Sequence, residues 1–369
     1  MKKKRVLHIL WDGNLGGVQR YVEKVSTSAY WKNTENYVLI LANEGEVINS
    51  HGKLNVEVIC LNISSKFQIK KCYSSLIKLI KKFKIDLIHC HCDSLFILTQ
   101  LRFLKECKVI YTEHGDSFVR TERQFVSELL WKINGVNWNK ILLNSEHTRK
   151  LFLQKFPFLK PFAEVLSNPL LEDVESSIRE QSPNFSIGTL GRLSHVKGND
   201  MFIKAAKCIS EKYPQASFHL YGDGEERGNL ENLVNELNLS EKFQFHGFTS
   251  NPIDKMRDLD CLVVPSRAES FGLVAVEALA VGTPVAAFEG TGVADFVVDH
   301  INGALAEMGN VQQLADAVSY VLKNSDNWRR LSMNGMETVR EHFSLKKHIG
   351  KLETIYSQVL HEEQQEETA

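Results

Sequence analysis

The sequence predicts an α/β protein built from two doubly wound domains. Short apolar runs alternate with segments of helical period along nearly the whole chain, a rhythm typical of parallel sheets covered by helices on both faces. The length of 369 residues gives room for two domains of ordinary size, and 43% hydrophobic with 24% charged residues is typical of globular proteins. Ligands of such sheets bind at the carboxyl ends of the strands. We therefore expect two facing domains with a deep cleft that holds the active site.

The apolar runs predict eleven strands in two series. The first series comprises Arg5–Leu10, Tyr37–Ala42, Val56–Leu61, Leu87–His91, Val109–Thr112 and Lys140–Asn144. The second comprises Ser186–Leu190, Ser217–Tyr221, Phe243–His246, Cys261–Pro265 and Val285–Phe288. A proline-containing stretch, Phe156–Pro169, joins them, so we expect one domain over residues 1–165 and another over 166–344. The opening residues are basic and then apolar, but this apolar run is too short for a secretory leader.

Charge is divided unevenly between the two halves. Residues 1–165 hold 26 Lys and Arg against 15 Asp and Glu, whereas the remainder holds 18 against 30. A basic half can attract nucleic acid, anionic lipid or an acidic glycan, but no nucleic-acid-binding motif accompanies it, so we expect no nucleic acid partner. Between Lys66 and Lys84, seven lysines share a segment with an apolar stripe of helical spacing. It predicts either an ordinary crossover helix or one that also touches an anionic membrane surface.

The cysteines and the hydropathy of the sequence indicate the cellular compartment in which the protein is expected. The seven cysteines are odd in number and contain no Cys-x-x-Cys pair, which favours reduced thiols over a disulfide framework. No run of eighteen apolar residues is present. We expect a cytoplasmic protein, with contact at the inner face of the membrane as a further hypothesis.

The most informative stretch is SRAESFGLVAVEALAVGTPVAAFEG, in which Glu269 and Glu277 lie eight positions apart. It predicts a tight loop, a helix from Phe271 to Val281 and a short strand. The N–H groups at a helix N-terminus suit a phosphate, whereas carboxylates beside an anion suit sugar hydroxyls. A nucleotide sugar carries both groups. The alternative is a capping carboxylate followed by a solvated helix position.

This stretch resembles the retaining family-4 (group 1) glycosyltransferases of the GT-B fold. The resemblance rests on Glu, seven residues, Glu, with Ser-Phe-Gly after the first and Ala-Leu-Ala-x-Gly-Thr-Pro-Val after the second. It implies that Glu269 lies by the donor sugar, that Glu277 holds the ribose hydroxyls, and that the backbone of Phe271, Gly272 and Leu273 faces the donor. It also implies that the final segment, residues 345–369, starts with a helix that crosses back to the first domain and ends in an acidic tail.

A second motif, Gly191-Arg192-Leu193-Ser194-His195-Val196-Lys197-Gly198, follows a predicted strand. Arg192 and Lys197 stand where a diphosphate needs neutralising, and Arg can hold phosphate oxygens with two hydrogen bonds. The element resembles Gly-Arg-x-x-x-x-Lys-Gly of the same family. Since no Asp-x-Asp site stands nearby, we expect no metal and no other cofactor. Surface charge is the competing interpretation.

Three glycine-containing strand ends complete the predicted donor site. Gly16 and Gly17 follow the first strand and match the family's Gly-Gly-x-x-Arg loop, which lies against the donor; alone they are as consistent with a plain turn. Gly222 ends one later strand, and His246 with Gly247 ends the next, where the family lines its base pocket. The loop from Glu289 to Asp295 departs from the family's Gly-Gly-x-x-Glu, so we assign it no role.

Two histidine motifs lie in the first half. His114 closes a strand, where it could donate a hydrogen bond to a sugar hydroxyl or to the departing phosphate, and the resemblance implies a place close to the donor sugar; a structural histidine is the alternative. His89-Cys90-His91-Cys92 consists of metal-ligand types. Strand alternation points the two histidines to one face and the cysteines to the other, so we expect no zinc.

The resemblance implies a retaining hexosyltransferase, and we expect it to be metal-independent. The donor would be a UDP-sugar, with a GDP-sugar as second choice, and the acceptor a glycan or lipid-linked molecule bound by the basic first domain. Cell-surface polysaccharide or lipopolysaccharide synthesis is the expected pathway. The alternatives are a sugar-nucleotide epimerase of the same architecture and a catalytically silent scaffold.

Overall fold

The computed structural model divides the chain into two compact units. Unit 1 comprises Met1–Leu171 and Leu345–Ala369, and unit 2 comprises Glu172–Ser344. The structure describes residues 3–14, 16–42, 45, 56–63, 69–92, 107–115, 138–175 and 177–361. In this part of the chain no helix combines the length and the apolar character needed to cross a membrane.

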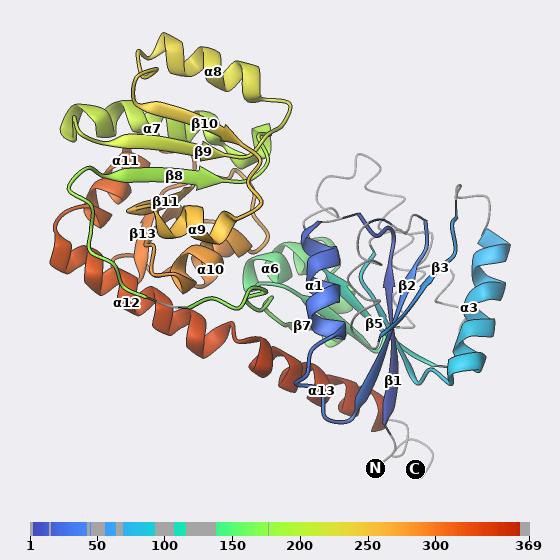
Figure 1. Cartoon of the computed structure of the whole chain (residues 1–369). Helices are drawn as coiled ribbons and strands as arrows, with labels where there is room; N and C mark the ends of the chain where they lie inside the picture. The colour runs from blue at the N-terminus through green and yellow to red at the C-terminus, as the bar shows by residue number, and fades with distance from the viewer. Residues whose placement is uncertain are drawn as a thin grey trace. The chain divides into compact units, whose positions relative to one another are not determined.

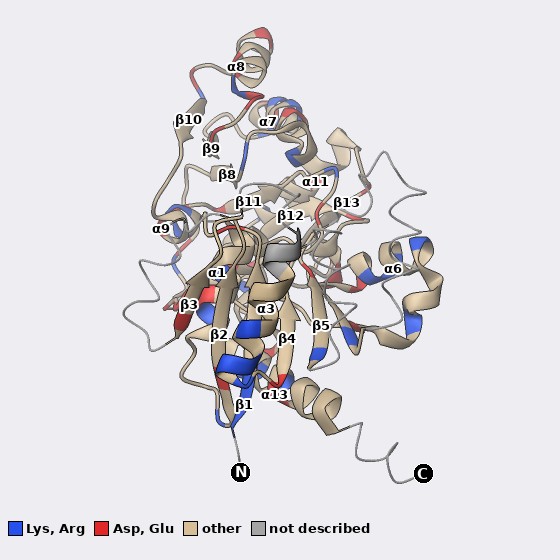
Figure 2. Cartoon of the chain, turned by 90° about the vertical axis from the view of Figure 1, so that its right-hand side faces the viewer, with Lys and Arg blue, Asp and Glu red and all other residues tan. Residues whose placement is uncertain are grey.

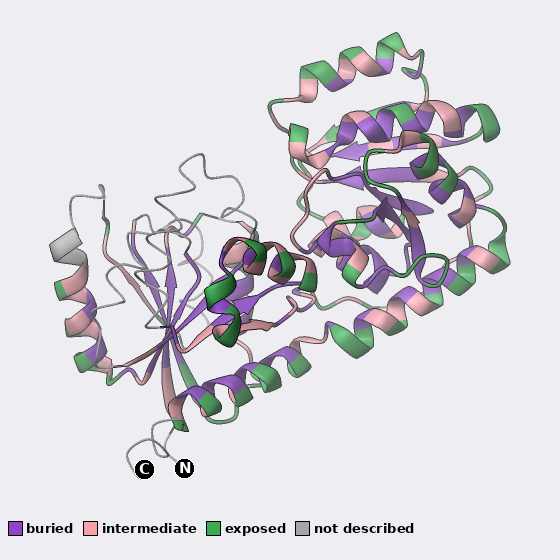
Figure 3. Cartoon of the chain, turned by 180° about the vertical axis from the view of Figure 1, so that it is seen from behind, coloured by how far each residue is buried: buried purple, intermediate pink, exposed green. Residues whose placement is uncertain are grey.

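Unit 1 is built on a seven-stranded sheet in which every neighbouring pair is parallel (Figure 1). The strand order is β3-β2-β1-β4-β5-β6-β7. The strands are β1 (Lys4–Leu10), β2 (Thr34–Ile40), β3 (Glu57–Cys60), β4 (Leu87–Cys90), β5 (Lys108–Glu113), β6 (Lys140–Leu143) and β7 (Ala163–Val165). β1 is an inner strand and pairs with β2 on one side and β4 on the other. The central strands are almost wholly buried, as the purple ribbons in Figure 3 show, which explains their continuous apolar runs.

The helices of unit 1 pack their apolar stripes on this sheet. They are α1 (Gly17–Ser26), α3 (Ile69–Phe83), α6 (Glu146–Lys155) and α13 (Leu345–His361), with the 3₁₀ turn η3 at Pro157–Phe162. α3 buries Leu76 and Ile80 in the core and leaves Lys78, Lys81 and Lys82 exposed. α6 begins after Ser145, whose side chain accepts a hydrogen bond from the Thr148 N–H at 2.9 Å and so caps the helix. The final helix, α13, belongs to unit 1.

Unit 2 has a six-stranded sheet, again entirely parallel, in the order β10-β9-β8-β11-β12-β13. Its strands are β8 (Ser186–Leu190), β9 (Ser217–Tyr221), β10 (Phe243–Gly247), β11 (Cys261–Val264), β12 (Val285–Phe288) and β13 (Gly303–Ala306). Its helices are α7 (Asn199–Lys212), α8 (Arg227–Glu236), α9 (Pro252–Arg257), α10 (Leu273–Ala280), α11 (Val311–Val321) and α12 (Ser325–His342), with 3₁₀ turns η4 (His195–Lys197) and η5 (Gly292–Asp295). Two Rossmann-like units of this kind, each with a parallel sheet and covering helices, confirm the predicted fold class.

Two strands were not predicted, and one helix is shorter than predicted. β7 has only three half-buried residues, and β13 reads Gly-Ala-Leu-Ala, without a β-branched or aromatic side chain. α10 begins at Leu273 instead of Phe271, because Gly272 before it has a φ of 91°, in the left-handed region. It ends at Ala280 instead of Val281.

Candidate active site

The predicted residues Lys197 and Glu269 meet in unit 2. Lys197 ends the 3₁₀ turn that follows β8, and Glu269 lies in the loop after the neighbouring strand β11. The Lys197 Nζ lies 2.6 Å from Glu269 Oε2, and the Ser266 Oγ donates to the same oxygen at 3.3 Å. The lysine side chain is 33% exposed and the glutamate side chain 13%. The pair is therefore held at the carboxyl edge of the sheet, with the cation still accessible to an anion.

An arginine not predicted from the sequence holds these two loops together. Arg267 donates to both carboxylate oxygens of Asp200, at 2.7 and 2.8 Å, and to the His195 carbonyl at 2.8 Å. Its backbone N–H also donates to the Val196 carbonyl at 2.8 Å. Burial raises the pKa of Asp200, but the hydrogen bonds and charge of Arg267 outweigh this and hold that pKa below its usual value. This bidentate pair fixes the backbone on either side of Lys197.

Arg192 occupies the start of the same loop. Its side chain is exposed, and within the described residues it makes no hydrogen bond or ion pair. A guanidinium in this state can turn toward a phosphate without first breaking a protein contact. The two predicted cations therefore lie in one loop. Lys197 is paired with Glu269, whereas Arg192 has no ion pair among the described residues.

The N-terminus of α10 lies just beyond Glu269. The helix starts at Leu273, which is half-buried, so the first-turn N–H groups follow Gly272. The Phe271 ring is buried and packs on Phe296 and Phe343, at centroid distances of 5.4 and 5.6 Å. Only the backbone of Phe271 can therefore serve a ligand. Glu277 is a half-buried residue within α10.

The residues predicted to line a base pocket lie together at the ends of β9 and β10. The His246 ring stacks on Tyr221 with centroids 4.3 Å apart, and its Nε2 lies 3.0 Å from the Nδ1 of His219. The N–H of Gly222 donates to the Gly247 carbonyl at 2.7 Å. A Cβ at Gly222 would lie 1.8 Å from the Gly191 carbonyl oxygen, so only glycine permits this close approach of the loops. The side chains of His219 and His246 have a lowered pKa because of burial.

In unit 1, Gly16 and Gly17 stand at the start of α1. Gly16 is the residue before the helix and has an extended backbone, with a φ of −147°. A Cβ at Gly17 would meet nothing within 4 Å. The helix N-terminus is thus placed directly after the loop that follows β1, as the sequence predicted.

His114 is half-buried and belongs to a histidine cluster, otherwise buried, that the sequence did not predict. The cluster comprises His8, His89, His91, His114 and His348, with Tyr21 and Tyr356. His91 Nδ1 lies 2.9 Å from His114 Nε2, and His91 Nε2 lies 3.0 Å from His8 Nδ1. The available signal was register, because His8 pairs directly with His89 across β1 and β4. Alternation on β4 then places His91 on the same face.

Helix α13 supplies two members of this cluster. His348 Nε2 accepts a hydrogen bond from the Tyr21 hydroxyl at 2.8 Å, and its Nδ1 lies 3.0 Å from the Ser167 carbonyl oxygen. The Tyr356 hydroxyl lies 2.7 Å from His89 Nδ1. The Tyr21 ring meets the His114 ring edge to face, with centroids 4.9 Å apart. The position of His114 is therefore held by packing as well as by its hydrogen bond.

Burial lowers the pKa of four of these histidines. It lowers the pKa of His114 and of His348 to about 3. The pKa values of His89 and His91 lie well below the ordinary value, first because of burial and then because neighbouring histidines repel a second charge. Burial also raises the pKa of Tyr21. His114 is thus a neutral imidazole at neutral pH.

Side chains of the His-Cys-His-Cys motif point as alternation predicts. His89 and His91 join the histidine cluster, while Cys90 and Cys92 pack in the apolar core. Ring nitrogens of His8, His89 and His91 lie within 4.8 Å of one another, so these three could hold a metal ion. Each of their ring nitrogens is already hydrogen-bonded, to Asn36, Thr112, Tyr356 or another histidine of the cluster. A metal would have to displace those bonds.

Comparison with known proteins identifies the class. The fold matches solved GT-B glycosyltransferases: Anabaena HepE in complex with UDP aligns with a TM-score of 0.80 at 20% identity, over 96% of this chain and 99% of that one. Staphylococcus aureus TarM, in a complex that contains UDP, also aligns with a TM-score of 0.80, at 15% identity, over 96% and 99% of the two chains. These likenesses establish the GT-B architecture.

The sequence establishes the family. Residues 173–338 match the glycosyl transferases group 1 and residues 20–145 the glycosyl transferase 4-like domain. An uncharacterised glycosyltransferase of Methanocaldococcus jannaschii is 30% identical over 283 residues, covering 74% of this chain and 76% of its own. The O-antigen biosynthesis glycosyltransferase WclY of Escherichia coli is 28% identical over 324 residues, covering 82% and 86%. The chain belongs to the group 1 glycosyltransferases.

Proposed function

We propose that this glycosyltransferase moves a hexose from a UDP-sugar to a glycan or lipid-linked acceptor, with retention and without a metal ion. A UDP donor is supported by the UDP complexes of HepE and TarM. A role in cell-surface polysaccharide or lipopolysaccharide synthesis is supported by WclY and by a poly(ribitol-phosphate) α-N-acetylglucosaminyltransferase of S. aureus. The latter is 25% identical over 83% of this chain and 61% of its own length.

The observation that carries the proposal is the Lys197–Glu269 pair beside the exposed Arg192. The difficult step is departure of the diphosphate, which gains negative charge as the sugar becomes oxocarbenium-like. Lys197, Arg192 and the N-terminus of α10 can stabilise that charge. When phosphate oxygens take up Lys197, the carboxylate of Glu269 becomes free to accept hydrogen bonds from the sugar.

The remaining roles follow the resemblance to the family. Glu277 holds the ribose hydroxyls; Gly222, His246 and Gly247 line the base; Gly16 and Gly17 approach the donor; and His114 meets the donor sugar. Retention proceeds by front-face displacement, in which the departing phosphate takes the acceptor's proton. We assign no carboxylate as a covalent nucleophile.

A loose contact with anionic lipid would bring the enzyme to a lipid-linked acceptor. Lys78, Lys81, Lys82 and Lys84 are exposed on and directly after α3, which is the helix with blue bands in Figure 2. Each such lysine near an anionic surface contributes about 1 kcal/mol. Sedimentation with phosphatidylglycerol vesicles at low salt measures this contact, and replacing these lysines with glutamine should abolish it. Equal sedimentation of wild type and the glutamine variant would refute it.

Thermal shift with UDP, GDP and ADP tests the donor site. We expect UDP to raise the midpoint for wild type but not for Arg192→Ala or Lys197→Ala. Arg340→Ala is the matched control, because Arg340 is exposed on α12 and its one ion pair among the described residues is with Glu337, one turn away. A donor that stabilises all variants equally would show that the site lies elsewhere.

Turnover tests the chemistry. With a UDP-hexose as donor, NMR of the product's anomeric proton should show retained configuration, and excess EDTA should leave the rate unchanged. Release of an epimerised UDP-sugar without acceptor would instead indicate an epimerase.

A further inference from the structure

Three histidines of unit 1 form one continuous hydrogen-bonded row from Asn36 to His114. His8 Nε2 lies 3.1 Å from Asn36 Oδ1, and the row continues through His91 to His114 over distances of 3.0 and 2.9 Å. His8 and His91 use both ring nitrogens in the row. Asn36, His8 and His91 are all buried.

A row of neutral imidazoles has a direction. Each neutral ring carries one N–H and one lone pair, so a ring that donates at one nitrogen must accept at the other. The direction at one end of the row therefore determines the tautomer of every ring in it. Two directions are possible, and the group at the end decides between them.

Asn36 decides in favour of one direction. Its Nδ2, which can only donate, bonds to the Ser26 carbonyl oxygen at 3.2 Å. The reverse placement of the amide would set two oxygens against each other. Oδ1 therefore faces His8, and since this oxygen can only accept, His8 Nε2 carries the proton. His8 Nδ1 then accepts from His91 Nε2–H, and His91 Nδ1 accepts from His114 Nε2–H.

We propose that Asn36, acting through His8 and His91, fixes His114 as the Nε2–H tautomer and so makes Nδ1 a hydrogen-bond acceptor. This proposal rests on the proposed role of His114 at the donor sugar. In that role His114 accepts a hydrogen bond from a sugar hydroxyl and does not donate to the departing phosphate. Asn36, His8 and His91 are positioning residues, because they act only through His114.

His348 provides a contrast within the same cluster. Its Nδ1 faces the Ser167 carbonyl oxygen, which can only accept, so Nδ1 carries the proton. Its Nε2 accepts from the Tyr21 hydroxyl. The structure thus predicts opposite tautomers for His114 and His348, although burial lowers the pKa of both to about 3.

Nitrogen NMR of the full chain labelled with ¹⁵N-histidine tests the tautomers directly. Two-bond proton–nitrogen correlations distinguish a protonated ring nitrogen from one with a lone pair. At pH 7.5 we expect protonated Nε2 and bare Nδ1 for His8, His91 and His114, and the reverse for His348. Assignment uses one His→Gln variant for each ring. A protonated Nδ1 at His114 in the wild type would overturn the proposal.

Variants at Asn36 test what sets the direction. Asn36→Leu removes the acceptor and should raise the Nδ1–H population of His114 about tenfold, the change that loss of one hydrogen-bond preference implies. Thr34→Val is the matched control, since Thr34 lies on the same strand and face, is buried and has no hydrogen bond at Oγ1 among the described residues. His8→Gln should keep the wild-type tautomers, because an amide can accept from His91 and donate to Asn36.

Measuring UDP binding distinguishes failure of the tautomer proposal from failure of the proposed donor site. UDP should raise the melting midpoint of Asn36→Leu and wild type equally, because its proposed site lies in unit 2, while UDP-hexose turnover falls only in Asn36→Leu. Unchanged tautomers in a folded Asn36→Leu would refute the relay. Absence of UDP binding by wild type would instead refute the donor site and leave the tautomer result standing. If Asn36→Leu fails to fold, the wild-type spectrum and His8→Gln decide the question.

Discussion

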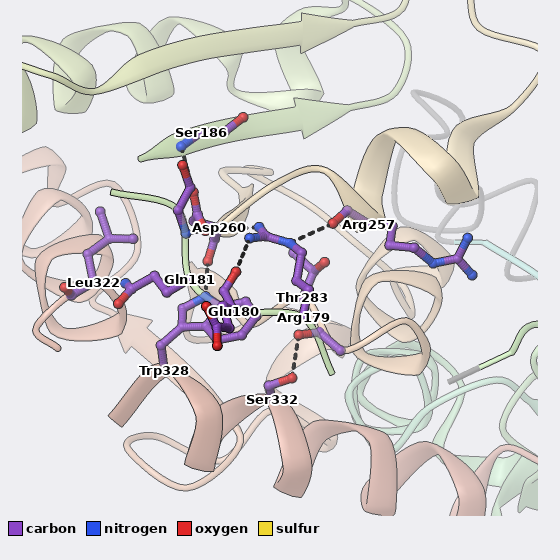
Figure 4. Close-up of polar contacts among 12 residues, drawn as sticks. Arg179, Glu180, Gln181, Ser186, Arg257, Asp260, Thr283, Leu322, Trp328 and Ser332 are labelled. Atoms are coloured by element: carbon purple, nitrogen blue, oxygen red, sulfur yellow. Dashed lines mark hydrogen bonds and ion pairs between the residues drawn. The ribbon is translucent and has the colours of Figure 1, made fainter. Parts of the chain in front are cut away.

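The histidine cluster of unit 1 and Asp260 of unit 2 are buried polar groups of opposite kinds. Unit 1 gathers histidines whose rings are neutral at pH 7 because burial lowers their pKa. Unit 2 buries a carboxylate, Asp260, with no exposed side-chain surface, and surrounds it with donors. Arg179 donates to Oδ1 at 2.9 Å, and the N–H groups of Ser182 and Ser186 donate to the two oxygens at 2.9 and 2.8 Å (Figure 4).

Asp260 and the histidine cluster show two ways in which a protein offsets the desolvation cost of a buried polar group. A buried charge is tolerated only when several donors replace water, and Asp260 anchors the segment before β8 by collecting such donors. Neutral imidazoles need only one donor and one acceptor each, so they can form a chain with a direction. The first arrangement fixes backbone, whereas the second determines where protons lie.

The largest expected effect is a loss of stability of unit 1 at acidic pH. Below pH 6.5 the unfolded chain protonates its histidines, but in folded unit 1 His114 and His348 stay neutral down to about pH 3. The unfolded state then binds more protons, so stability falls as pH falls, by about 1.4 kcal/mol per pH unit for each such ring. His89, His91, His114 and His348 shift in this direction. The positive charge of Lys351 lowers the pKa of His348 further.

Unit 2 should resist acid longer. Asp200 has a lowered pKa, so its contribution is lost only as pH falls below the ordinary value of 3.8. His219 and His246 shift in the same direction as the histidines of unit 1, but they are less buried and contribute less. Trp328 is the single tryptophan of unit 2 and reports on it, while Trp328→Phe leaves signals from unit 1 only. Simultaneous loss of both signals above pH 5 would contradict this prediction.

Removing the carboxylate of Asp260 should lower the free energy of unfolding less than acid does, but more than removing a single buried hydroxyl. Asp260→Ala leaves Arg179 and two backbone N–H groups without their acceptor, and we expect a loss of about 3–5 kcal/mol. Urea unfolding followed by Trp328 fluorescence measures it, since the Trp328 indole N–H donates to the Asp260 carbonyl at 2.7 Å.

The control for this variant is Asp258→Ala. Asp258 is exposed two positions earlier, and its replacement should change the unfolding free energy by less than about 0.5 kcal/mol. Equal effects of the two variants would show that the donors around Asp260 find water instead.

The sequence predicted these two regions unequally. Apolar runs predicted the buried strands well, because a strand covered on both faces has no polar alternation. β13 was not predicted, since Gly-Ala-Leu-Ala has no β-branched or aromatic residue. The predicted site loops occur at strand ends, where the topology of parallel sheets requires them. The Arg267–Asp200 pair joins residues 67 positions apart, and no local pattern encodes such a contact.

The histidine cluster was hidden for a related reason. His8 and His348 are 340 positions apart in the sequence, and no local pattern around either residue indicates that they meet. Only the register of β1 against β4 and the packing of α13 bring them together. Residue type could indicate chemistry at His114, but only the three-dimensional arrangement shows which ring nitrogen carries the proton.

The smallest expected effect tests whether hydrogen bonding or packing holds the cluster. Tyr356→Phe removes the hydroxyl that lies 2.7 Å from His89 Nδ1 and leaves the ring stacked on Trp31, with centroids 5.7 Å apart. His89 keeps Thr112 at its other nitrogen, so we expect a loss of about 1–3 kcal/mol. Urea unfolding followed by tryptophan fluorescence in the Trp328→Phe background measures it for unit 1 alone.

Tyr30→Phe serves as the control, because Tyr30 is 49% exposed and should change the unfolding free energy by less than about 0.5 kcal/mol. A loss of that small size for Tyr356→Phe as well would mean that packing of the Tyr356 ring, and not its hydroxyl, stabilises this part of α13. A loss in the expected range would mean that the neutral cluster, like Asp260, stabilises its unit by satisfying each buried polar atom. The histidine cluster and Asp260 would then differ in charge, but both would be tolerated because their buried polar atoms are hydrogen-bonded.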